Sequence, residues 1–449
     1  MKKLEVGFSR IVINPPMGIR IAGYYVDRFA KGVLDDLEAN AVAISCGDKK
    51  VLLIAVDHCG LVKPILDVYR SEISKNTNVP MDAIYIHSTH THTGPMLLPE
   101  TDDVLINEYK QTLCEKLIEV SKCALADLKP AVLGYGIGNA PNIAFIRRFR
   151  MKDGSIRTNP GVNNPDIKEP IGEVDERVNV LRFDRENASS VVVVNFANHP
   201  DTVGGELISG DWPTLTRHTV EKVLDDVKCI FFNGAQGDVN HVKVFPTSGD
   251  FNGMFNDFDG CSRGYAHTKY MARVVTGAVL QVFDKVNYIP VNSIDYVQKI
   301  VQIPSNKPTA EEMPLAHKYN DLHNAGRDDE IPFKAMMLTT VVADSARKVR
   351  LENAPDTFPM LFSAVRIGSV AMFGIPGEPF TGVGRGLKET SGYDLILPTC
   401  NTNAKEGYFP MKDAYKEGGY EAKASNFKEG VAEKIIEEGQ KILKELLEK

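Results

Sequence analysis

Ala83-Ile84-Tyr85-Ile86-His87-Ser88-Thr89-His90-Thr91-His92-Thr93-Gly94-Pro95 is the stretch that decides the fold, because an apolar run leads directly into three histidines and a turn. Such a run predicts a buried strand, and in α/β folds the ligand-binding loops begin where strands end. Side chains alternate along an extended strand, so the spacing predicts that His90 and His92 project to one side and His87 to the other. One imidazole would then bind a metal while the second acts on a bound water.

An isolated histidine is more often a hydrogen-bonded surface or core group than a ligand. Here three of the chain's ten histidines fall within six residues, which favours the metal site.

The bulk composition is that of an ordinary globular protein: 449 residues, 43% of them hydrophobic, are enough for two average domains or one large α/β domain. The seven cysteines are odd in number and form no Cys-x-x-Cys pair, which disfavours a disulfide framework and predicts buried thiols.

Charge and hydropathy exclude several classes of partner. The net charge is −7, and the 52 basic and 59 acidic residues are spread along the chain, so nucleic acid and anionic lipid are not expected partners. No apolar run approaches the roughly 20 residues of a membrane helix, so no integral membrane segment is expected. The first ten residues have no apolar core of a secretory signal. We therefore expect a cytoplasmic protein; its oligomeric state is left open.

Apolar runs alternate with helical patterns along most of the chain, which predicts an α/β fold. Strands are predicted at 41–45, 51–56, 83–86, 131–136, 178–183, 191–196, 229–232, 362–367 and 369–373, and helices at 64–74, 106–128, 212–224, 262–283 and about 426–449. Residues 184–188 are too few for a parallel crossover, so the central sheet should be mixed and flanked by helices. We predict a single large domain, 1–449, with insertions: an irregular loop at 153–170 and a candidate helical insertion at 305–350.

Four further segments place metal-competent or catalytic side chains at the ends of predicted strands. They contain His199 before Pro200, Asp238 and His241 after the strand at 229–232, Glu378 in Pro376-Gly377-Glu378, and Tyr408 and Tyr420 after the run 395–403. Each has an ordinary structural alternative, such as a turn shaped by proline, a Gly-Asp turn or a solvated carboxylate. The functional interpretation therefore depends on the combination of segments.

In this order the segments resemble the catalytic domain of the neutral/alkaline, non-lysosomal ceramidase family. The resemblance covers about residues 5–427 and rests on His90-Thr-His92-Thr-Gly-Pro95, His199-Pro200, Ser209-Gly-Asp211, Gly237-Asp-Val239, Pro376-Gly-Glu378 and the Tyr408/Tyr420 pair. It implies one Zn²⁺ per chain, held by His90, His199, Glu378 and Tyr408. It also implies that His92, Arg147 (or the adjacent Arg148) and Tyr420 surround a scissile linear amide.

The implied set has a coherent chemistry. Two neutral imidazoles and one carboxylate leave zinc with room for water, whose pKa falls from about 15.7 toward about 7. The resulting hydroxide would attack the amide carbonyl, with Tyr420 and Arg147 donating to the oxyanion and His92 passing a proton to the departing amine. Asp57, His58 and Asp211 are candidates either to orient the ligand imidazoles or to serve as structural caps.

The chain departs from the family pattern at Gly234, where ceramidases carry a serine, and we expect a divergent member without the C-terminal immunoglobulin-like domain. The predicted substrate is therefore a small-molecule amide or a lipid-like compound, with an ester or lactone equally open, and not ceramide itself. Two other functions stay open: a phosphoester hydrolase with two metals that uses Asp57, Asp238 and His241 as further ligands, and a non-enzymatic protein that binds a small ligand or carbohydrate.

Overall fold

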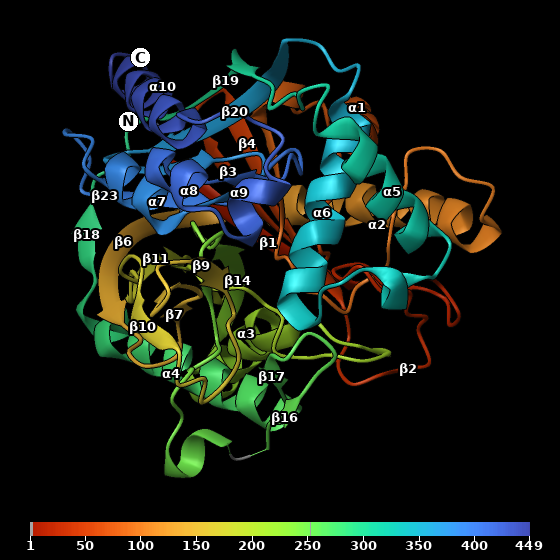
Figure 1. Ribbon diagram of the computed structural model, residues 1–449. Helices are drawn as coiled ribbons and strands as arrows, with labels where there is room; N and C mark the ends of the chain where they lie inside the picture. The colour runs from red at the N-terminus through yellow and green to blue at the C-terminus, as the bar shows by residue number, and fades with distance from the viewer. Residues whose placement is uncertain (1–2, 252) are drawn as a thin grey trace.

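A mixed sheet of nine strands forms the centre of the protein, whose computed structural model describes residues 3–251 and 253–449 (Figure 1). Its strands are β1 (Leu4–Val12), β3 (Glu38–Cys46), β4 (Lys49–Val56), β5 (Ile84–Ser88), β6 (Lys129–Asn139), β11 (Arg177–Arg185), β12 (Ser190–Phe196), β14 (Val227–Asn233) and β18 (Asn287–Ile289). The order is β14-β12-β11-β6-β1-β3-β4-β5, with β18 paired to β6. The β4–β5 and β12–β14 pairs are parallel and the others antiparallel, so the predicted mixed sheet is confirmed.

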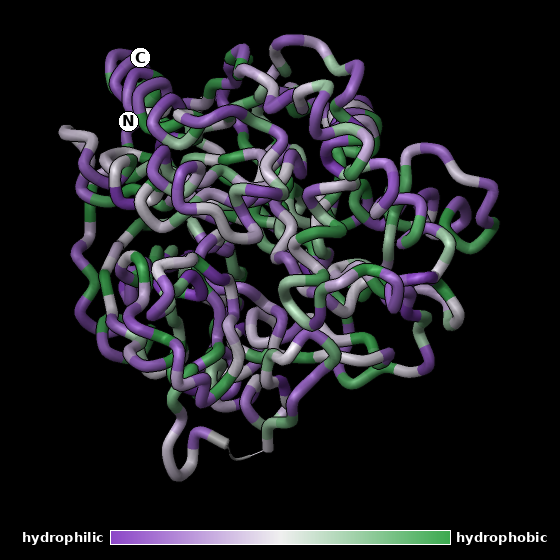
Figure 2. Tube along the Cα trace, viewed as in Figure 1, coloured by the Kyte–Doolittle hydropathy of each residue, from purple (hydrophilic) through white to green (hydrophobic). Residues whose placement is uncertain are grey.

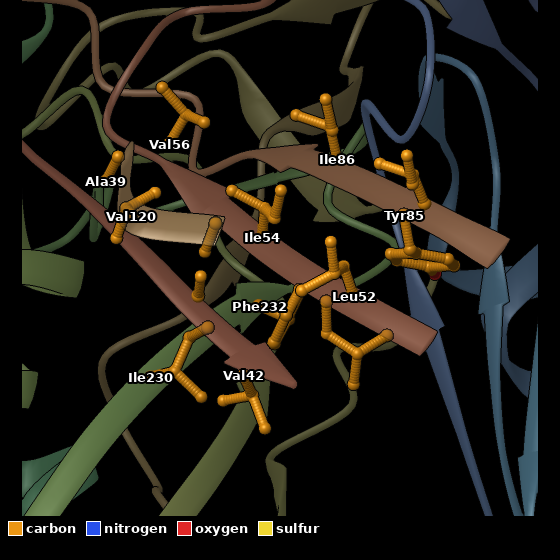
Figure 3. Close-up of a cluster of buried hydrophobic side chains, with 14 of the residues drawn as sticks. Ala39, Val42, Leu52, Ile54, Val56, Tyr85, Ile86, Val120, Ile230 and Phe232 are labelled. Atoms are coloured by element: carbon orange, nitrogen blue, oxygen red, sulfur yellow. The ribbon is translucent and has the colours of Figure 1, made fainter. Parts of the chain in front are cut away.

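The two outermost strands of this sheet, β14 and β5, also lie close to each other. The backbone N–H of Asn233, at the end of β14, donates to Nε2 of His87 on β5 at 2.9 Å. Ile230 and Phe232 of β14 therefore lie in the same buried cluster as Leu52 of β4 (Figure 3). Each large apolar side chain buried in this way contributes roughly 1.5–3 kcal/mol to stability. The packing holds the ends of strands that are far apart in the sheet next to one another.

Helices alternate with strands along the chain, as the α/β pattern predicts. They are α1 (Lys63–Thr77), α2 (Val104–Ala126), α3 (Asp211–Val223), α4 (Tyr265–Val282), α5 (Met313–Asn324), α6 (Ala335–Leu351), α7 (Thr381–Lys388), α8 (Lys412–Glu417), α9 (Tyr420–Ala424) and α10 (Val431–Leu447), with short 3₁₀ turns η1 (Met81–Ala83), η2 (Ser248–Phe251), η3 (Phe283–Lys285) and η4 (Asp328–Glu330). Helix α2 packs on β1 and β3, whereas α3 packs on β14 and α4 on β6.

A second, four-stranded sheet lies against the first. Its order is β19 (Ile294–Pro304), β20 (Thr357–Ile367), β21 (Val370–Gly374) and β23 (Leu395–Thr399), and β21 and β23 are parallel. Helix α10 packs on it, and the alternation of hydrophilic and hydrophobic residues along α10 is visible in Figure 2. The N–H of Asn403 donates to the carbonyl of Ile86 at 2.8 Å, and the Ile86 N–H donates to Asn403 Oδ1 at 2.9 Å. The ends of β5 and β23 therefore lie side by side.

The remaining strands form short ladders around the ends of the two sheets. They are β2 (Gly32–Val33), β7 (Phe145–Ile146), β8 (Arg148–Met151), β9 (Ile156–Thr158), β10 (Ile167–Pro170), β13 (Leu207–Ile208), β15 (Val239–Asn240), β16 (Phe255–Asn256), β17 (Ser262–Arg263), β22 (Glu378–Pro379) and β24 (Tyr408–Phe409). The prediction of an irregular loop at 153–170 is wrong in part, because β9 and β10 flank β8 in an antiparallel sheet. The Gly and Asn residues of this stretch supply the turns between them.

Two helices, α5 and α6, pack on each other in the stretch 305–350, between β19 and β20.

Over residues 3–251 and 253–449, the structure contains no helix that combines the length and the apolar character needed to cross a bilayer. None of the seven cysteines, all of which lie within the described residues, forms a disulfide bond. The prediction that they are buried is wrong for two residues of α2, because Cys123 is exposed and Cys114 is half-buried.

Candidate functional site

Three side chains meet where strands of both sheets end. His90 follows β5, His199 follows β12, and Glu378 forms β22 just after β21. Oε2 of Glu378 lies 3.3 Å from Nε2 of His90 and 3.2 Å from Nε2 of His199. All three residues are buried, and their ligand atoms are close enough together to hold one metal ion. We refer to His90, His199 and Glu378 as the metal group.

The reason that His90 and His92 lie together differs from the one that the sequence suggested. Strand β5 ends at Ser88, and His90 has a φ of 78°, in the left-handed region, so the two residues lie in a turn and not on one face of a strand. The turn brings Nε2 of His92 within 3.3 Å of Nε2 of His90. His87 has a structural role, because its two ring nitrogens hydrogen-bond to the backbone of Cys400 and Asn233.

Backbone carbonyls orient the two imidazoles of the metal group. Nδ1 of His90 hydrogen-bonds to the carbonyl of Cys59, and Nδ1 of His199 lies 2.8 Å from the carbonyl of Gln236. A proton on Nδ1 leaves Nε2 with a free lone pair, which is the form that binds a metal. Oε2 of Glu378 is buried and has no hydrogen-bond donor. A buried carboxylate oxygen without a donor is costly, and a cation bound there would remove that cost, so these residues fit a metal.

The charges within the metal group act on one another. Burial lowers the pKa of His90, but the carboxylate of Glu378 and the thiol of Cys59 outweigh it and raise the value to about 10. Burial raises the pKa of Glu378, whereas His90 and His199 lower it further, to well below its usual range. The site therefore attracts positive charge to the space between the carboxylate and the two rings.

The acids proposed to orient the ligand imidazoles have other partners. Asp57 has a structural role, because it is paired with the guanidinium of Arg217 at 2.6 Å and accepts from the N–H of Glu38 inside the fold. Nδ1 of His58 accepts from the N–H of Gly60. Asp211 accepts from the N–H groups of Val203 and Trp212, which makes it the structural cap of the two alternatives.

Tyr408 reaches the metal group through a short parallel ladder. Strands β22 and β24 pair Glu378 directly with Tyr408, and the Glu378 N–H donates to the carbonyl of Gly407 at 2.8 Å. The ring of Tyr408 stacks on that of His199, with 6.5 Å between centroids. Burial and the charge of Glu378 raise the pKa of Tyr408 well above its usual value, and Arg147 opposes this.

Arg147 borders the metal group, whereas Arg148 points elsewhere. Nη1 of Arg147 lies 3.3 Å from Nε2 of His199, and its Nε donates to Glu421 Oε1 at 2.6 Å. Arg148 is paired with Glu417 at 3.0 Å and does not line the cavity described below. The structure therefore favours Arg147 of the two candidates. Glu421, which follows Tyr420 directly, holds Arg147 in place, although no motif of the sequence indicated this role.

A cavity of about 580 Å³ opens onto these side chains. Its lining includes His90, His92, Arg147, Glu378, Tyr408 and Tyr420, which are six of the seven site residues predicted from the sequence. It also includes residues that were not predicted as site residues, among them Tyr25, Cys59, Asp201, Arg263, Arg350 and Lys405. Cys59 and Asp201 gave a weak signal, because they directly follow the strand-end pairs Asp57-His58 and His199-Pro200.

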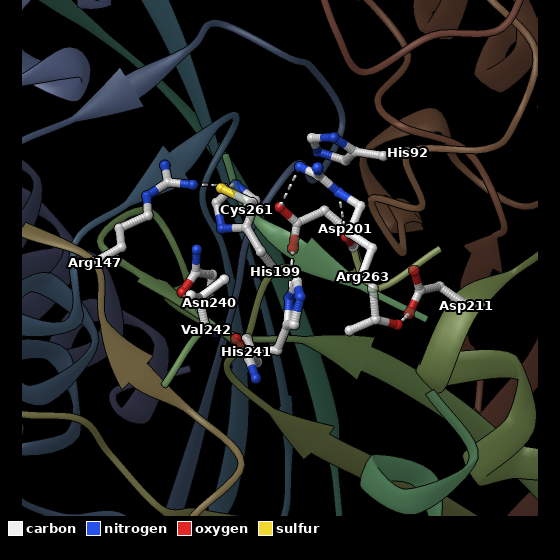
Figure 4. A network of polar contacts seen from close by, with 12 residues as sticks. His92, Arg147, His199, Asp201, Asp211, Asn240, His241, Val242, Cys261 and Arg263 are labelled. Carbon is white, nitrogen blue, oxygen red and sulfur yellow. Dashed lines mark hydrogen bonds and ion pairs between the residues drawn. The ribbon is translucent and has the colours of Figure 1, made fainter. Parts of the chain in front are cut away.

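One of these additions, Asp201, connects the cavity wall to His241. The carboxylate of Asp201 lies 3.1 Å from Nδ1 of His241, and its other oxygen lies 3.8 Å from the guanidinium of Arg263 (Figure 4). His241 also hydrogen-bonds to the carbonyl of Ser262 through Nε2 at 2.6 Å. Both ring nitrogens of His241 are therefore occupied by the protein.

The proposed ligands of a second metal do not converge. Asp57 is paired with Arg217, Asp238 accepts from the N–H and the hydroxyl of Thr381, and His241 is held by Asp201. Within the described parts of the chain, the one other metal-competent group is Cys59, His90 and His92, which shares His90 with the first. Asp57, Asp238 and His241 are therefore not placed to bind a second metal ion, as the two-metal phosphoester hydrolase would require.

Gly234, which replaces the serine expected from the family, does not line the cavity. Its N–H donates to the carbonyl of Phe196 at 2.9 Å, and a Cβ at this position would lie 2.9 Å from Cβ of Ala197. Close packing on Ala197 explains the glycine locally. The substitution therefore does not alter the surface of the cavity directly.

Comparison of the fold with solved structures confirms the resemblance at the level of architecture. The neutral ceramidase from Pseudomonas aeruginosa superimposes with a TM-score of 0.72 at 16% identity, covering 98% of this chain and 74% of that chain. A ceramidase complexed with C2 gives a TM-score of 0.74 at 16% identity, covering 99% of this chain and 76% of that chain. No protein-family model matches the sequence, and no curated protein matches it.

Proposed function

We propose that this protein is a zinc-dependent hydrolase that cleaves a linear amide, with the metal held by His90, His199, Glu378 and Tyr408. The observation that carries the proposal is the convergence of two oriented imidazole nitrogens on one buried carboxylate oxygen, at 3.3 and 3.2 Å. Two histidines and one carboxylate are a ligand set of catalytic zinc sites. The ceramidase fold supports an amide as the bond that is cleaved.

A bound zinc ion would supply Lewis acidity, which activates water and polarises a carbonyl group. Tyr420 and Arg147 line the cavity next to the metal group, and both present donors to an oxygen that gains negative charge. Burial and His90 lower the pKa of His92, so His92 is neutral and its unpartnered Nδ1 is free to exchange a proton. We assign to His92 the transfer of that proton to the departing amine.

Metal analysis combined with a substrate panel tests the proposal. We expect roughly one zinc per chain, and hydrolysis of N-acyl amides of graded chain length that stops with a chelator and returns with zinc. The ligand set also occurs around ferrous iron, so iron is measured in the same samples. A stoichiometry near two would favour phosphoester hydrolysis. Tight ligand binding that a chelator does not affect, without turnover of amides or esters, would favour a binding protein.

Removal of one hydroxyl tests the role of Tyr420. We expect Tyr420→Phe to lower kcat by about 10²–10³-fold with unchanged metal content, because a donor to the oxyanion is lost. Tyr319→Phe is the matched control, since Tyr319 packs on Phe333 outside the cavity and should leave kcat unchanged. Steady-state kinetics with metal analysis distinguishes the two variants. Full activity of Tyr420→Phe would remove this residue from the mechanism.

A further inference from the structure

Two cationic side chains in the cavity have no carboxylate partner. Nζ of Lys405 donates to Sγ of Cys59 at 3.5 Å, and Nη2 of Arg350 donates to Oδ1 of Asn426 at 2.6 Å. Across residues 3–251 and 253–449, no carboxylate oxygen lies within the 4.0 Å ion-pair distance of either cation. The other two arginines of the cavity differ, because Arg147 is paired with Glu421 and Arg263 with Asp259.

Lys405 is held in place beside the metal group. Its stem packs on Gly60, where a Cβ would lie 2.3 Å from Cδ of Lys405, and Gly60 has a φ of 153° that favours glycine. The thiol of Cys59 separates the ammonium from the metal group, since Sγ lies 4.0 Å from Nδ1 of His90. The ammonium of Lys405 is therefore one side chain away from the proposed metal.

The second cation belongs to the same end of the cavity. Asn426, which accepts from Arg350, donates through Nδ2 to the carbonyl of Glu406, the residue after Lys405, at 2.9 Å. Burial raises the pKa of Tyr25, whereas the charges of both cations lower it. Glu406, the next residue along the chain, does not neutralise Lys405, because the charge that acts on its carboxyl is that of Lys63. Lys405 and Arg350 thus place two positive charges on the wall of the cavity that also contains Tyr25 and Tyr420.

We propose that the substrate carries an anionic group, a carboxylate or a phosphate, close to its amide, and that Lys405 and Arg350 bind this group. A neutral N-acyl amide would leave both cations without a carboxylate partner, whereas an anion would form charge-assisted hydrogen bonds with them. The identity of the amide as the reacting bond rests on the proposed function, but the recognition of the anion does not.

Two matched pairs of probes test the inference. N-hexanoylglycine is compared with its neutral amide, N-hexanoylglycinamide, and N-hexanoyl-O-phosphoethanolamine with N-hexanoylethanolamine. Calorimetry gives Kd for each compound, and a hydrolysis assay gives kcat/KM. We expect the anionic member of one pair to bind about ten- to a hundredfold more tightly than its neutral partner, which is the range of a hydrogen bond between charged groups. The pair with the larger difference identifies carboxylate or phosphate.

Substitution of Lys405 and of Arg350 shows whether these residues cause the preference for the anion. We expect Lys405→Met, which keeps the aliphatic stem over Gly60, to remove most of the preference for the anion and to leave the neutral compound unchanged. Arg350→Met provides a second test in case Lys405→Met folds poorly, because Arg350 lies at an exposed position. We expect this variant to weaken the same preference for the anion. Lys441→Met on the exposed face of α10 is the control for a lost surface charge and should retain the preference.

The outcomes separate this inference from the proposed function. Equal affinity within both pairs, an absence of binding by both anions, or an equal loss for anion and neutral compound in Lys405→Met would overturn it. A preference for the anion that depends on Lys405, without hydrolysis of any probe, would uphold the binding site and contradict the hydrolase.

Discussion

Replacement of Glu378 with alanine is expected to remove the bound metal and to lower kcat by about a thousandfold or more. The carboxylate is the one negative charge in the metal group, and its Oε2 lies between the two imidazole nitrogens. Without it, the two rings present only neutral donors to a divalent cation, and the Lewis acidity worth several kcal/mol is lost. Metal content by mass spectrometry and kcat on the best amide of the panel measure both effects.

Glu406→Ala is the matched control, because Glu406 lines the same cavity but does not belong to the metal group. It should retain one metal per chain and nearly full activity. His90→Ala should behave like Glu378→Ala. Retention of the metal in both His90→Ala and Glu378→Ala would end the metal assignment, whatever the activity of the variants.

The largest expected effect on stability is that of Arg217→Met. Arg217 is fully buried and pairs with Asp57 at 2.6 Å and with Glu38 at 3.0 Å. Its loss leaves the buried carboxylate of Asp57 without its cation and removes one of the cations around Glu38, which keeps Arg10 and His218. Breaking such a buried pair typically costs about 3–5 kcal/mol of the free energy of unfolding. Urea denaturation at pH 7 measures the change. Lys299→Met removes an exposed pair with Glu445 and should have little effect, so equal losses in the two variants would contradict the prediction.

The pH dependence of stability provides a second readout for this buried pair. Burial raises the pKa of Glu38, but His218 and Arg217 outweigh it and lower the value to about 2. A carboxyl whose folded pKa is depressed stabilises the protein above its unfolded pKa, near 4.5, and loses that contribution as the pH falls toward 2. Arg217→Met should therefore flatten the dependence of stability on pH in this window.

Much of the fold follows from local pattern. The apolar runs at 41–45 and 51–56, with the turn between them, become the hairpin of β3 and β4, and the short connection at 184–188 becomes the antiparallel pair β11–β12. Strand β19 has no comparable signal, because most of its residues are half-buried or exposed and its hydrophobic residues do not alternate regularly with polar ones. The ladder of β8, β9 and β10 could not be predicted, because its segment is rich in turn residues. Pairing between the three strands, and not their composition, determines the structure there.

The site was predictable to the extent that it depends on strand ends. His90, His199 and Glu378 each follow a strand, and the structure brings them together. The strand geometry assumed for His90 and His92 was wrong, because a residue with positive φ turns the chain there. The sequence left open whether Asp57 and Asp211 orient the imidazoles or have structural roles, and the structure gives both structural partners, because a carboxylate near a histidine in sequence can find a stronger partner elsewhere in space.

The sequence by itself determined the classes of element and the types of ligand, because periodicity and residue chemistry are local properties. Only the tertiary structure decided that the carbonyls of Cys59 and Gln236 orient the imidazoles, that Glu421 holds Arg147, and that Lys405 faces the cavity without a carboxylate. These relations join segments far apart in the chain, and they exist only because packing of the two sheets closes the distance between them.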